Sequence, residues 1–168
     1  MKSTGEVMGV DENFGMAFAK AQLATGIKLL NKGSVFISVK DTDKGKILEI
    51  AKNFLTLGYN IIATKGTALF LNNNNLKATP VNKVKEGSPH IVDKIKNGEI
   101  QFVVNTTFGN QSIKDSYSLR RASLNTNIPY YTTIAGSSAL LKALKALKEN
   151  NMTVTSLQDY TMQLSEKI

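Results

Sequence analysis

The stretch IIATKGTALFL, residues 61–71, contains two apolar runs separated by the short segment TKGT at residues 64–67. The first run is short and β-branched, which is typical of a buried strand and predicts one over residues 60–63. The second predicts a helix over residues 68–72, with Thr67 at its start. A strand that passes through a short polar turn into a helix is the repeating unit of α/β proteins.

The same alternation continues along the rest of the chain. Further strands are predicted over residues 35–39, 77–84, 100–104 and 129–132, with Pro80 favouring a sheet edge for the second of these. Further helices are predicted over residues 13–23, between Asp43 and Gly58, between Ser88 and Gly98 with Pro89 in the first turn, over residues 115–126, around Leu140–Leu147, and from Ser156, which has capping-box spacing to Asp159. The fold class is therefore α/β: a three-layer sandwich with a mainly parallel five-stranded sheet and helices on both faces.

Length and composition limit the possible functions. A chain of 168 residues suffices for one domain with a core. It contains no cysteine, which excludes disulfides and thiolate metal sites, and its single histidine excludes a histidine-rich zinc site. No apolar stretch reaches membrane-spanning length and the N-terminus lacks the apolar core of a signal peptide, so we expect a cytoplasmic location and no membrane partner.

The net charge of +8 favours an anionic partner, such as a nucleotide, a phosphorylated metabolite, a nucleic acid or an acidic protein surface. Because the lysines are scattered and basic residues do not alternate with aromatic ones, a nucleic acid is the less favoured of these partners.

Polar side chains gather where the predicted strands end. In a parallel sheet the carboxyl ends of all strands lie on the same side, which we call the carboxyl edge of the sheet. These side chains are hydroxyls, amides and ammonium groups, in chain order Ser38, Lys44, Thr64, Thr67, Lys83, Asn105, Thr106, Thr107 and Thr132, and one glycine, Gly66, stands among them. Such donors suit a phosphate, particularly beside a helix N-terminus, and Gly66 would let the backbone approach the anion closely. The sequence therefore predicts a phosphate site at this edge.

Each of these residues also has a simpler interpretation. Thr64 and Thr67 could be helix caps, Gly66 could serve a tight turn, and Asn105 could belong to an ordinary loop. His90 has no acid at a spacing that would orient it, so a catalytic role is not predicted. Only the convergence of several strand ends favours a binding site over these alternatives.

At these residues the chain resembles the methylglyoxal-synthase-like family, specifically the C-terminal regulatory domain of the carbamoyl-phosphate synthetase large subunit. The resembling stretches are STGEVMG (3–9), AFAKAQL (17–23), ATKGTA (63–68), VNKV (81–84), GSPHI (87–91), NTT (105–107) and RR (120–121). The resemblance implies that residues 1–30 are the end of a preceding ATP-grasp synthetase unit with a connecting helix, and that residues 31–168 are the regulatory domain. The chain departs from the family pattern at Lys65, where histidine is common, and at Tyr131.

The resemblance also implies a function. Domains of this kind bind nucleoside monophosphates, UMP or IMP, and regulate an enzyme of arginine and pyrimidine biosynthesis without doing chemistry. Carried over by motif, the implied phosphate ligands are Lys44, Thr64, Thr67, Lys83, Asn105 and Thr107, with Ser38 and Thr106 beside the ribose or base and Tyr130 and Thr132 in an ornithine-linked region. The implied partners are the rest of the large subunit and the glutaminase small subunit. No catalytic residue, metal ligand or cofactor is expected in this fragment, whereas the parent enzymes use ATP with Mg²⁺ or Mn²⁺.

Two enzymes of similar fold are alternatives. Methylglyoxal synthase, a lyase acting on dihydroxyacetone phosphate, needs a carboxylate base beside the phosphate, and relatives that do this chemistry have aspartate where this chain has Asn105. An amide cannot abstract a proton, so this alternative is disfavoured. The cyclohydrolase portion of the bifunctional purine-synthesis enzyme is disfavoured because its glycine- and lysine-rich stretches are not matched.

Overall fold

The computed structural model describes residues 5–106 and 110–165, and the side chains of the same residues apart from 110–115 and 163–165. The regular elements, in chain order, are α1 (Phe14–Ala24), β1 (Gly33–Ser38), η1 (Asp41–Asp43), α2 (Lys44–Thr56), β2 (Tyr59–Thr64), α3 (Lys65–Asn73), β3 (Ala78–Val81), η2 (Val84–Glu86), α4 (Ile91–Lys96), β4 (Phe102–Asn105), α5 (Asn110–Asn125), β5 (Tyr130–Tyr131), α6 (Ile134–Glu149) and α7 (Leu157–Ser165).

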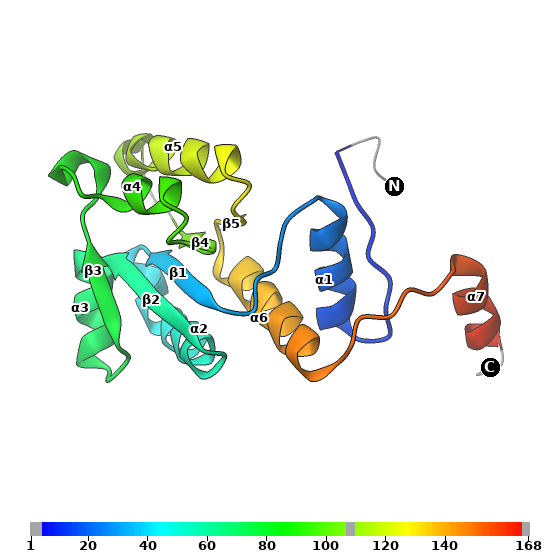
Figure 1. Cartoon of the computed structure of the whole chain (residues 1–168). Helices are drawn as coiled ribbons and strands as arrows, with labels where there is room; N and C mark the ends of the chain where they lie inside the picture. Colours follow the sequence, from blue (N-terminus) through cyan, green and yellow to red (C-terminus); the bar gives the residue numbers. More distant parts are fainter. Residues whose placement is uncertain (1–4, 107–109, 166–168) are drawn as a thin grey trace.

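The strands form one five-stranded sheet in the order β3-β2-β1-β4-β5, and each neighbouring pair is parallel (Figure 1). The predicted α/β class is confirmed. Pro80 lies in β3, at the edge of the sheet as predicted, where its missing N–H breaks no ladder in the sheet interior.

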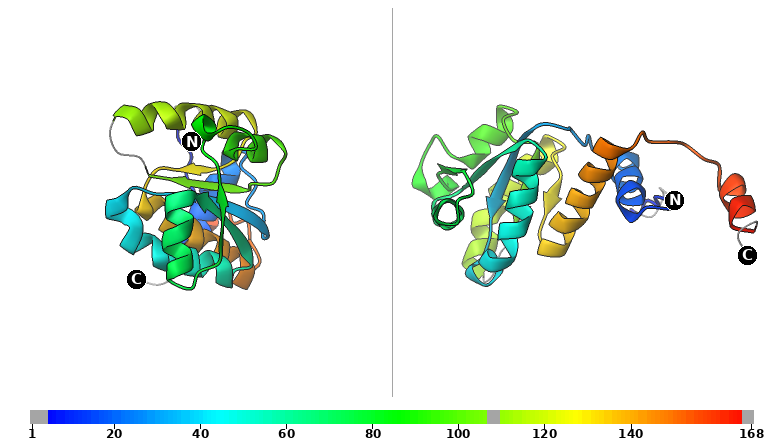
Figure 2. Two further views of the ribbon diagram at one scale, coloured as in Figure 1. Left: turned by 90° about the vertical axis from the view of Figure 1, so that its left-hand side faces the viewer. Right: turned by 90° about the horizontal axis from the view of Figure 1, so that it is seen from below.

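Helices cover both faces of the sheet, because alternate residues of each buried strand point to opposite sides. Val35 and Ile37 of β1 belong to a core with α2, α3 and α6, whereas Phe36 belongs to a second core with α4 and α5. Figures 1 and 2 show these two helical layers with the sheet between them. The result is the expected three-layer sandwich.

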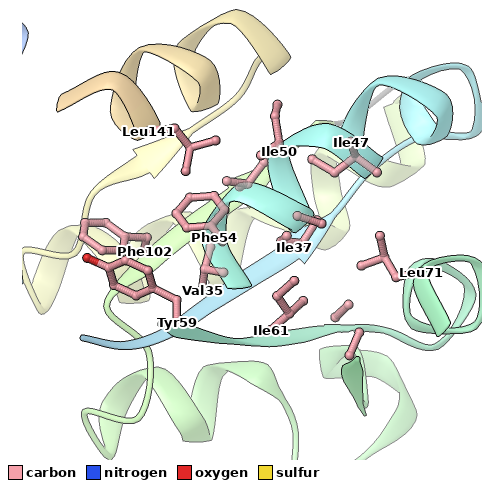
Figure 3. Close-up of a cluster of buried hydrophobic side chains, with 14 of the residues drawn as sticks. Val35, Ile37, Ile47, Ile50, Phe54, Tyr59, Ile61, Leu71, Phe102 and Leu141 are labelled. Carbon is pink, nitrogen blue, oxygen red and sulfur yellow. The ribbon is translucent and has the colours of Figure 1, made fainter. Parts of the chain in front are cut away.

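An aromatic group fills the first core at the amino end of the sheet. Tyr59 packs edge-on against Phe54 and Phe102, with ring centroids 5.7 and 5.6 Å away (Figure 3). The Tyr59 hydroxyl donates a hydrogen bond of 2.5 Å to the carbonyl of Leu30. Burial raises the pKa of Tyr59 to about 12, since the phenolate would lose its hydration there.

This raised pKa predicts a loss of stability in alkali. Above about pH 10 the unfolded chain releases the Tyr59 proton, whereas the folded chain keeps it up to about pH 12. The unfolded state then binds fewer protons, so the free energy of unfolding falls across this window, by about 2 kcal/mol for this group. Burial also raises the pKa of Tyr131, which adds a fall of the same sign. Urea unfolding at a series of alkaline pH values measures the fall, which should be smaller in Tyr59→Phe; equal slopes in the two proteins would contradict it.

The first helix packs on the outer side of α6 rather than on the sheet (Figure 1). The contact is made by Met16 and three alanines: Met16 and Ala19 of α1 meet Ala143 and Ala146 of α6 in a cluster of their own. A Cβ at Gly15 would lie 2.4 Å from the carbonyl oxygen of Lys142, so the two backbones approach closely there.

The last helix lies away from the sheet, at the end of an extended segment (Figure 2). It is tied to the N-terminal segment, where the Tyr160 hydroxyl donates to the carbonyl of Val10 at 3.4 Å and Lys20 lies 6.0 Å from the Tyr160 ring. Its start confirms the predicted cap, since the amide of Asp159 donates to the Ser156 hydroxyl at 3.1 Å. The division of the chain at residue 30 stays a prediction.

Three predicted helix starts need correction, and one of them is that of α5, which begins at Asn110 rather than at residue 115. Helix α3 begins at Lys65 rather than at Thr67, which lies within its first turn. Helix α4 begins at Ile91 with His90 as its N-cap, so Pro89 precedes the helix. Asp43 stands at the N-cap of α2 but makes no capping hydrogen bond.

Across the described ranges, no helix is both long enough and apolar enough to cross a bilayer.

Candidate functional site

The sheet register brings the predicted site residues together. Ser38 at the end of β1 pairs with Asn105 at the end of β4. On the other side of β1, Ile37 pairs with Ala63, which sets Thr64 beside Ser38. The carboxyl ends of β2, β1 and β4 therefore lie level along one edge.

A cluster of hydroxyls joins β1 to the start of α3. Thr64 Oγ1 lies 3.2 Å from Thr67 Oγ1 and 3.5 Å from Ser38 Oγ. Thr67, which is 2% exposed, accepts a hydrogen bond of 3.4 Å from the amide of Val39. These bonds hold the strand end and the helix start in a fixed relation.

The simpler interpretation of Thr64 as a capping side chain is wrong. Thr64 has the N-cap position of α3, but its hydroxyl bonds neighbouring hydroxyls and no helix amide. The N–H groups in the first turn of α3 therefore receive no cap from it, and with the helix dipole they favour an anion.

Gly66 does not serve a tight turn, because it lies inside α3 and outside the positive-φ glycines. A Cβ built on it would meet nothing within 4 Å. Open space therefore lies over the first turn of α3, as a close approach by a ligand requires.

Asn105 and Thr106 close the other side of the site. Asn105 is the last residue of β4 and 3% exposed, so it does not belong to an ordinary loop. Its amide nitrogen donates to Ser116 Oγ at 2.9 Å and to the Tyr130 hydroxyl at 2.5 Å. Thr106 Oγ1 accepts from the amide of Lys40 at 3.2 Å, which links the loops after β4 and β1.

Tyr130 therefore joins the cluster at the edge through Asn105. The Arg120 guanidinium lies 5.6 Å from the Tyr130 ring centroid, a cation–π arrangement that adds positive charge there. Thr132, the other residue of the ornithine-linked prediction, is exposed just beyond β5.

Two lysines beside the site, Lys44 and Lys65, are paired with carboxylates. Lys44 Nζ lies 2.8 Å from Asp41 Oδ1, and this ammonium lowers the pKa of Asp41. Lys65 Nζ lies 3.3 Å from Glu86 Oε2, an oxygen that also accepts the Lys83 amide at 3.1 Å. The Lys83 amide first, and then the Lys65 ammonium, lower the pKa of Glu86.

The side chains of two predicted ligands are not shown in this network. The Lys83 side chain is exposed, and its ammonium has no ion pair with any side chain that the structure describes. Thr107 lies outside the described residues.

An acid does lie three residues from His90, so the expectation that none stands near it is wrong, but it does not orient the ring as a catalytic partner, because Nδ1 accepts the Asp93 amide. Asp93 Oδ2 lies 3.1 Å from His90 Nδ1 and also accepts the His90 amide at 2.9 Å and the Ser88 hydroxyl at 2.8 Å. The His90 amide first, and then Ser88, lower the pKa of Asp93. The arrangement is a reciprocal cap at the start of α4, with the imidazole accepting from the Asp93 amide.

Sequence reasoning missed three contacts of the site: Ser116 with Asn105, Lys65 with Glu86, and Arg120 with Tyr130. Each joins two different elements of the chain, and the sequence spacing within one helix or strand does not reveal such a contact. Chemically, the edge offers backbone amides, hydroxyls, an amide side chain and lysines. Asp41 and Glu86, the carboxylates tied to it, are ion-paired, so the arrangement suits binding of an anion better than proton abstraction. Over the ranges described, no three His, Asp or Glu side chains lie close enough to hold a metal ion.

Comparison with known proteins adds a family match. Residues 46–132 match the family model described as the MGS-like domain. The carbamoyl phosphate synthase large chain of Rhizobium meliloti (strain 1021) is 49% identical over 160 residues, which are 95% of this chain and 14% of that protein. The protein named carbamoyl phosphate synthase large chain, C-terminal section, of Aquifex aeolicus (strain VF5) is 50% identical over 164 residues, 95% of this chain and 30% of that protein.

A solved structure shares the fold. Methylglyoxal synthase from Elizabethkingia anophelis NUHP1 superposes with a TM-score of 0.56 over 67% of this chain and 79% of its own, at 16% sequence identity. At 16% sequence identity, the similarity to this structure supports a shared fold and does not indicate a shared function. The chain spans less than a third of the length of the two synthase relatives above.

Proposed function

The chain belongs to the MGS-like domain family, and on this basis we propose that it is an allosteric regulatory domain that binds a nucleoside monophosphate at the carboxyl edge of its sheet. The observation behind the proposal is the level alignment of three strand ends, with Ser38, Thr64 and Asn105 side by side. The uncapped start of α3 and the open space over Gly66 lie at the same edge. A phosphate is the anion that such a set of donors suits.

In this proposal the phosphate is held by Lys44, Thr64, Gly66, Thr67, Lys83, Asn105 and Thr107, and Ser38 and Thr106 lie beside the ribose or base. UMP and IMP are the candidate nucleotides. Tyr130 and Thr132 belong to an ornithine-linked region at the border with the preceding part of the enzyme. The bond from Asn105 to Tyr130 would connect that region to the phosphate site.

The parent protein is proposed from its relatives, which are carbamoyl phosphate synthase large chains. The partners are then the rest of a large subunit and a glutaminase small subunit, in a cytoplasmic enzyme of arginine and pyrimidine biosynthesis. ATP with Mg²⁺ or Mn²⁺ would serve that parent, with no cofactor in the present region. Regulation requires that the nucleotide bind one arrangement of the domain and its neighbour better than another.

A lyase acting on dihydroxyacetone phosphate is the second candidate, because a methylglyoxal synthase shares the fold. The last position of β4 opposes it, since Asn105 uses its amide as a donor to Ser116 and Tyr130 and has no carboxylate to act as a base. Incubation with dihydroxyacetone phosphate separates the two candidates: release of methylglyoxal would support the lyase, and binding of UMP or IMP without turnover would support the regulatory domain.

Calorimetric titration with UMP and IMP tests the binding proposal. We expect Lys83→Ala and Thr67→Ala each to weaken binding by about 1–3 kcal/mol, because each removes a charge-assisted hydrogen bond to the phosphate. Thr67 is buried, so its variant is also compared by thermal melting without ligand. Lys148→Ala is the control, because Lys148 lies in the last turn of α6, away from the strand ends. Equal affinities in all three variants would mean that the phosphate binds elsewhere.

A further inference from the structure

We propose that Glu86 is a built-in competitor of the anionic ligand, which lowers the affinity of the site for phosphate by occupying donors at its rim. This inference rests on the proposed function, since it concerns the regulation of the same site. It begins with the place of Glu86, which ends the short helix η2 after the edge strand β3. Thr64 pairs with Val81 in the register of β2 and β3, so the segments that follow these two strands leave the same edge.

The Glu86 carboxylate contacts both of these segments. Its Oε2 lies 3.3 Å from the ammonium of Lys65, the residue between Thr64 and Gly66. The same oxygen accepts the amide of Lys83 at 3.1 Å. One carboxylate oxygen therefore spans the gap between the first turn of α3 and the segment that contains Lys83.

The two groups that Glu86 engages are a cation and a backbone N–H, the donors that a phosphate oxygen also prefers. They hold Glu86 in its charged form, since they lower the pKa of its carboxyl group. A dianionic phosphate at the start of α3 would be repelled by the Glu86 carboxylate, which is ion-paired with Lys65 in the same turn. The ligand must therefore displace Glu86 from Lys65 or bind against its repulsion.

Lys44 shows a similar pairing with Asp41, but there the carboxylate is almost fully exposed and lies three residues away on the same segment. A pair of that kind is local and weak. The Lys65–Glu86 pair is also exposed, at 62% and 37%, so its strength is modest too. Glu86 differs because it joins two segments that both border the site.

Replacing Glu86 with glutamine separates charge from shape. The side-chain oxygen of the glutamine can still accept the Lys83 amide, whereas the negative charge is lost. We expect Glu86→Gln to bind UMP, IMP and inorganic phosphate about 3- to 10-fold more tightly than the unaltered protein, by calorimetry at low salt. Glu86→Ala loses the charge and the acceptor together, so its gain should be smaller.

Glu99→Gln is the matched control. Glu99 is also ion-paired with a lysine, at 2.7 Å from Lys94 Nζ, and its pKa is also lowered, first by that lysine. It precedes β4 and so lies at the opposite edge of the sheet. The two variants have the same net charge, so a gain confined to Glu86→Gln cannot come from overall charge.

The outcomes distinguish the two proposals. Suppose that the unaltered protein binds the ligands but Glu86→Gln binds them no more tightly, or less tightly. That result would overturn the competitor role of Glu86 and leave the proposed nucleotide site unaffected. An equal gain in Glu99→Gln would overturn it too. If the unaltered protein binds none of the three ligands, the proposed function fails and the role of Glu86 fails with it. Thermal melting of each unliganded variant checks that the fold is kept.

Discussion

Gly15→Ala is expected to destabilise the protein by about 3 kcal/mol, although alanine is normally the better helix former. The added Cβ would lie 2.4 Å from the carbonyl oxygen of Lys142 and 2.8 Å from its carbonyl carbon. These are backbone atoms of α6, which cannot rotate away, so α1 must move outward and the packing of Met16 and Ala19 is loosened. Overpacking of this kind costs about 1–3 kcal/mol, and backbone contact places this site at the upper end.

Gly45→Ala provides the same substitution with the opposite expectation. Gly45 lies in α2 and a Cβ there would meet nothing within 4 Å. The gain in helix propensity should stabilise the protein by about 0.5–1 kcal/mol. Urea unfolding of both variants measures the difference. Stabilisation by both would show that α1 and α6 are not held at this distance in solution.

Asn105→Asp is expected to weaken nucleotide binding strongly and to destabilise the fold. The Asn105 amide donates to Ser116 and Tyr130, and Asn105 itself is only 3% exposed to solvent. A carboxylate of the same shape cannot donate, and its charge would be buried beside the anion. We expect a loss of stability of about 2 kcal/mol or more, and of affinity of at least about 10-fold.

The pH dependence of this variant separates charge from shape. Burial raises the pKa of a carboxyl group, so acidification should return the new side chain to its neutral form and recover part of the binding. Ser116→Ala is the control, because it removes the hydrogen bond to Asn105 without adding charge. Calorimetry across a series of pH values makes the comparison. Full affinity of Asn105→Asp at neutral pH would show that no phosphate binds beside Asn105.

The sheet and the meeting of its strand ends could be predicted from the sequence, because both depend on local patterns. Each strand is a short apolar run followed by polar residues, and parallel pairing brings such ends to one edge whatever the order of the strands. Thr64 and Asn105 could therefore be placed in one site before any contact was known.

The details of that edge could not be predicted, because they depend on contacts between distant segments. Asn105 donates a hydrogen bond to Ser116 of the next helix. Lys65, which follows β2, forms an ion pair with Glu86, which lies beyond the neighbouring strand β3. The predicted start of α4 was wrong for a different reason. Proline lacks an N–H and so fits the first turn of a helix as well as the segment before it. The imidazole of His90 accepts the Asp93 amide and takes the cap, which moves the start of the helix past Pro89.

Helix α6 has a neighbour on each side: Leu140 and Leu144 face the sheet, while Ala143 and Ala146 face α1. A second tie runs from Tyr131 of β5, whose hydroxyl donates to Gln22 of α1 at 3.1 Å. Helix α6 is therefore packed between the sheet and α1, so a movement of α1 would change its contacts with α6. Helix α1 is therefore joined by direct contacts to β5, the neighbour of the strand that ends in Asn105. If a ligand at Asn105 changes how α1 packs, then a change in α1 must alter the affinity for that ligand by the same coupling free energy.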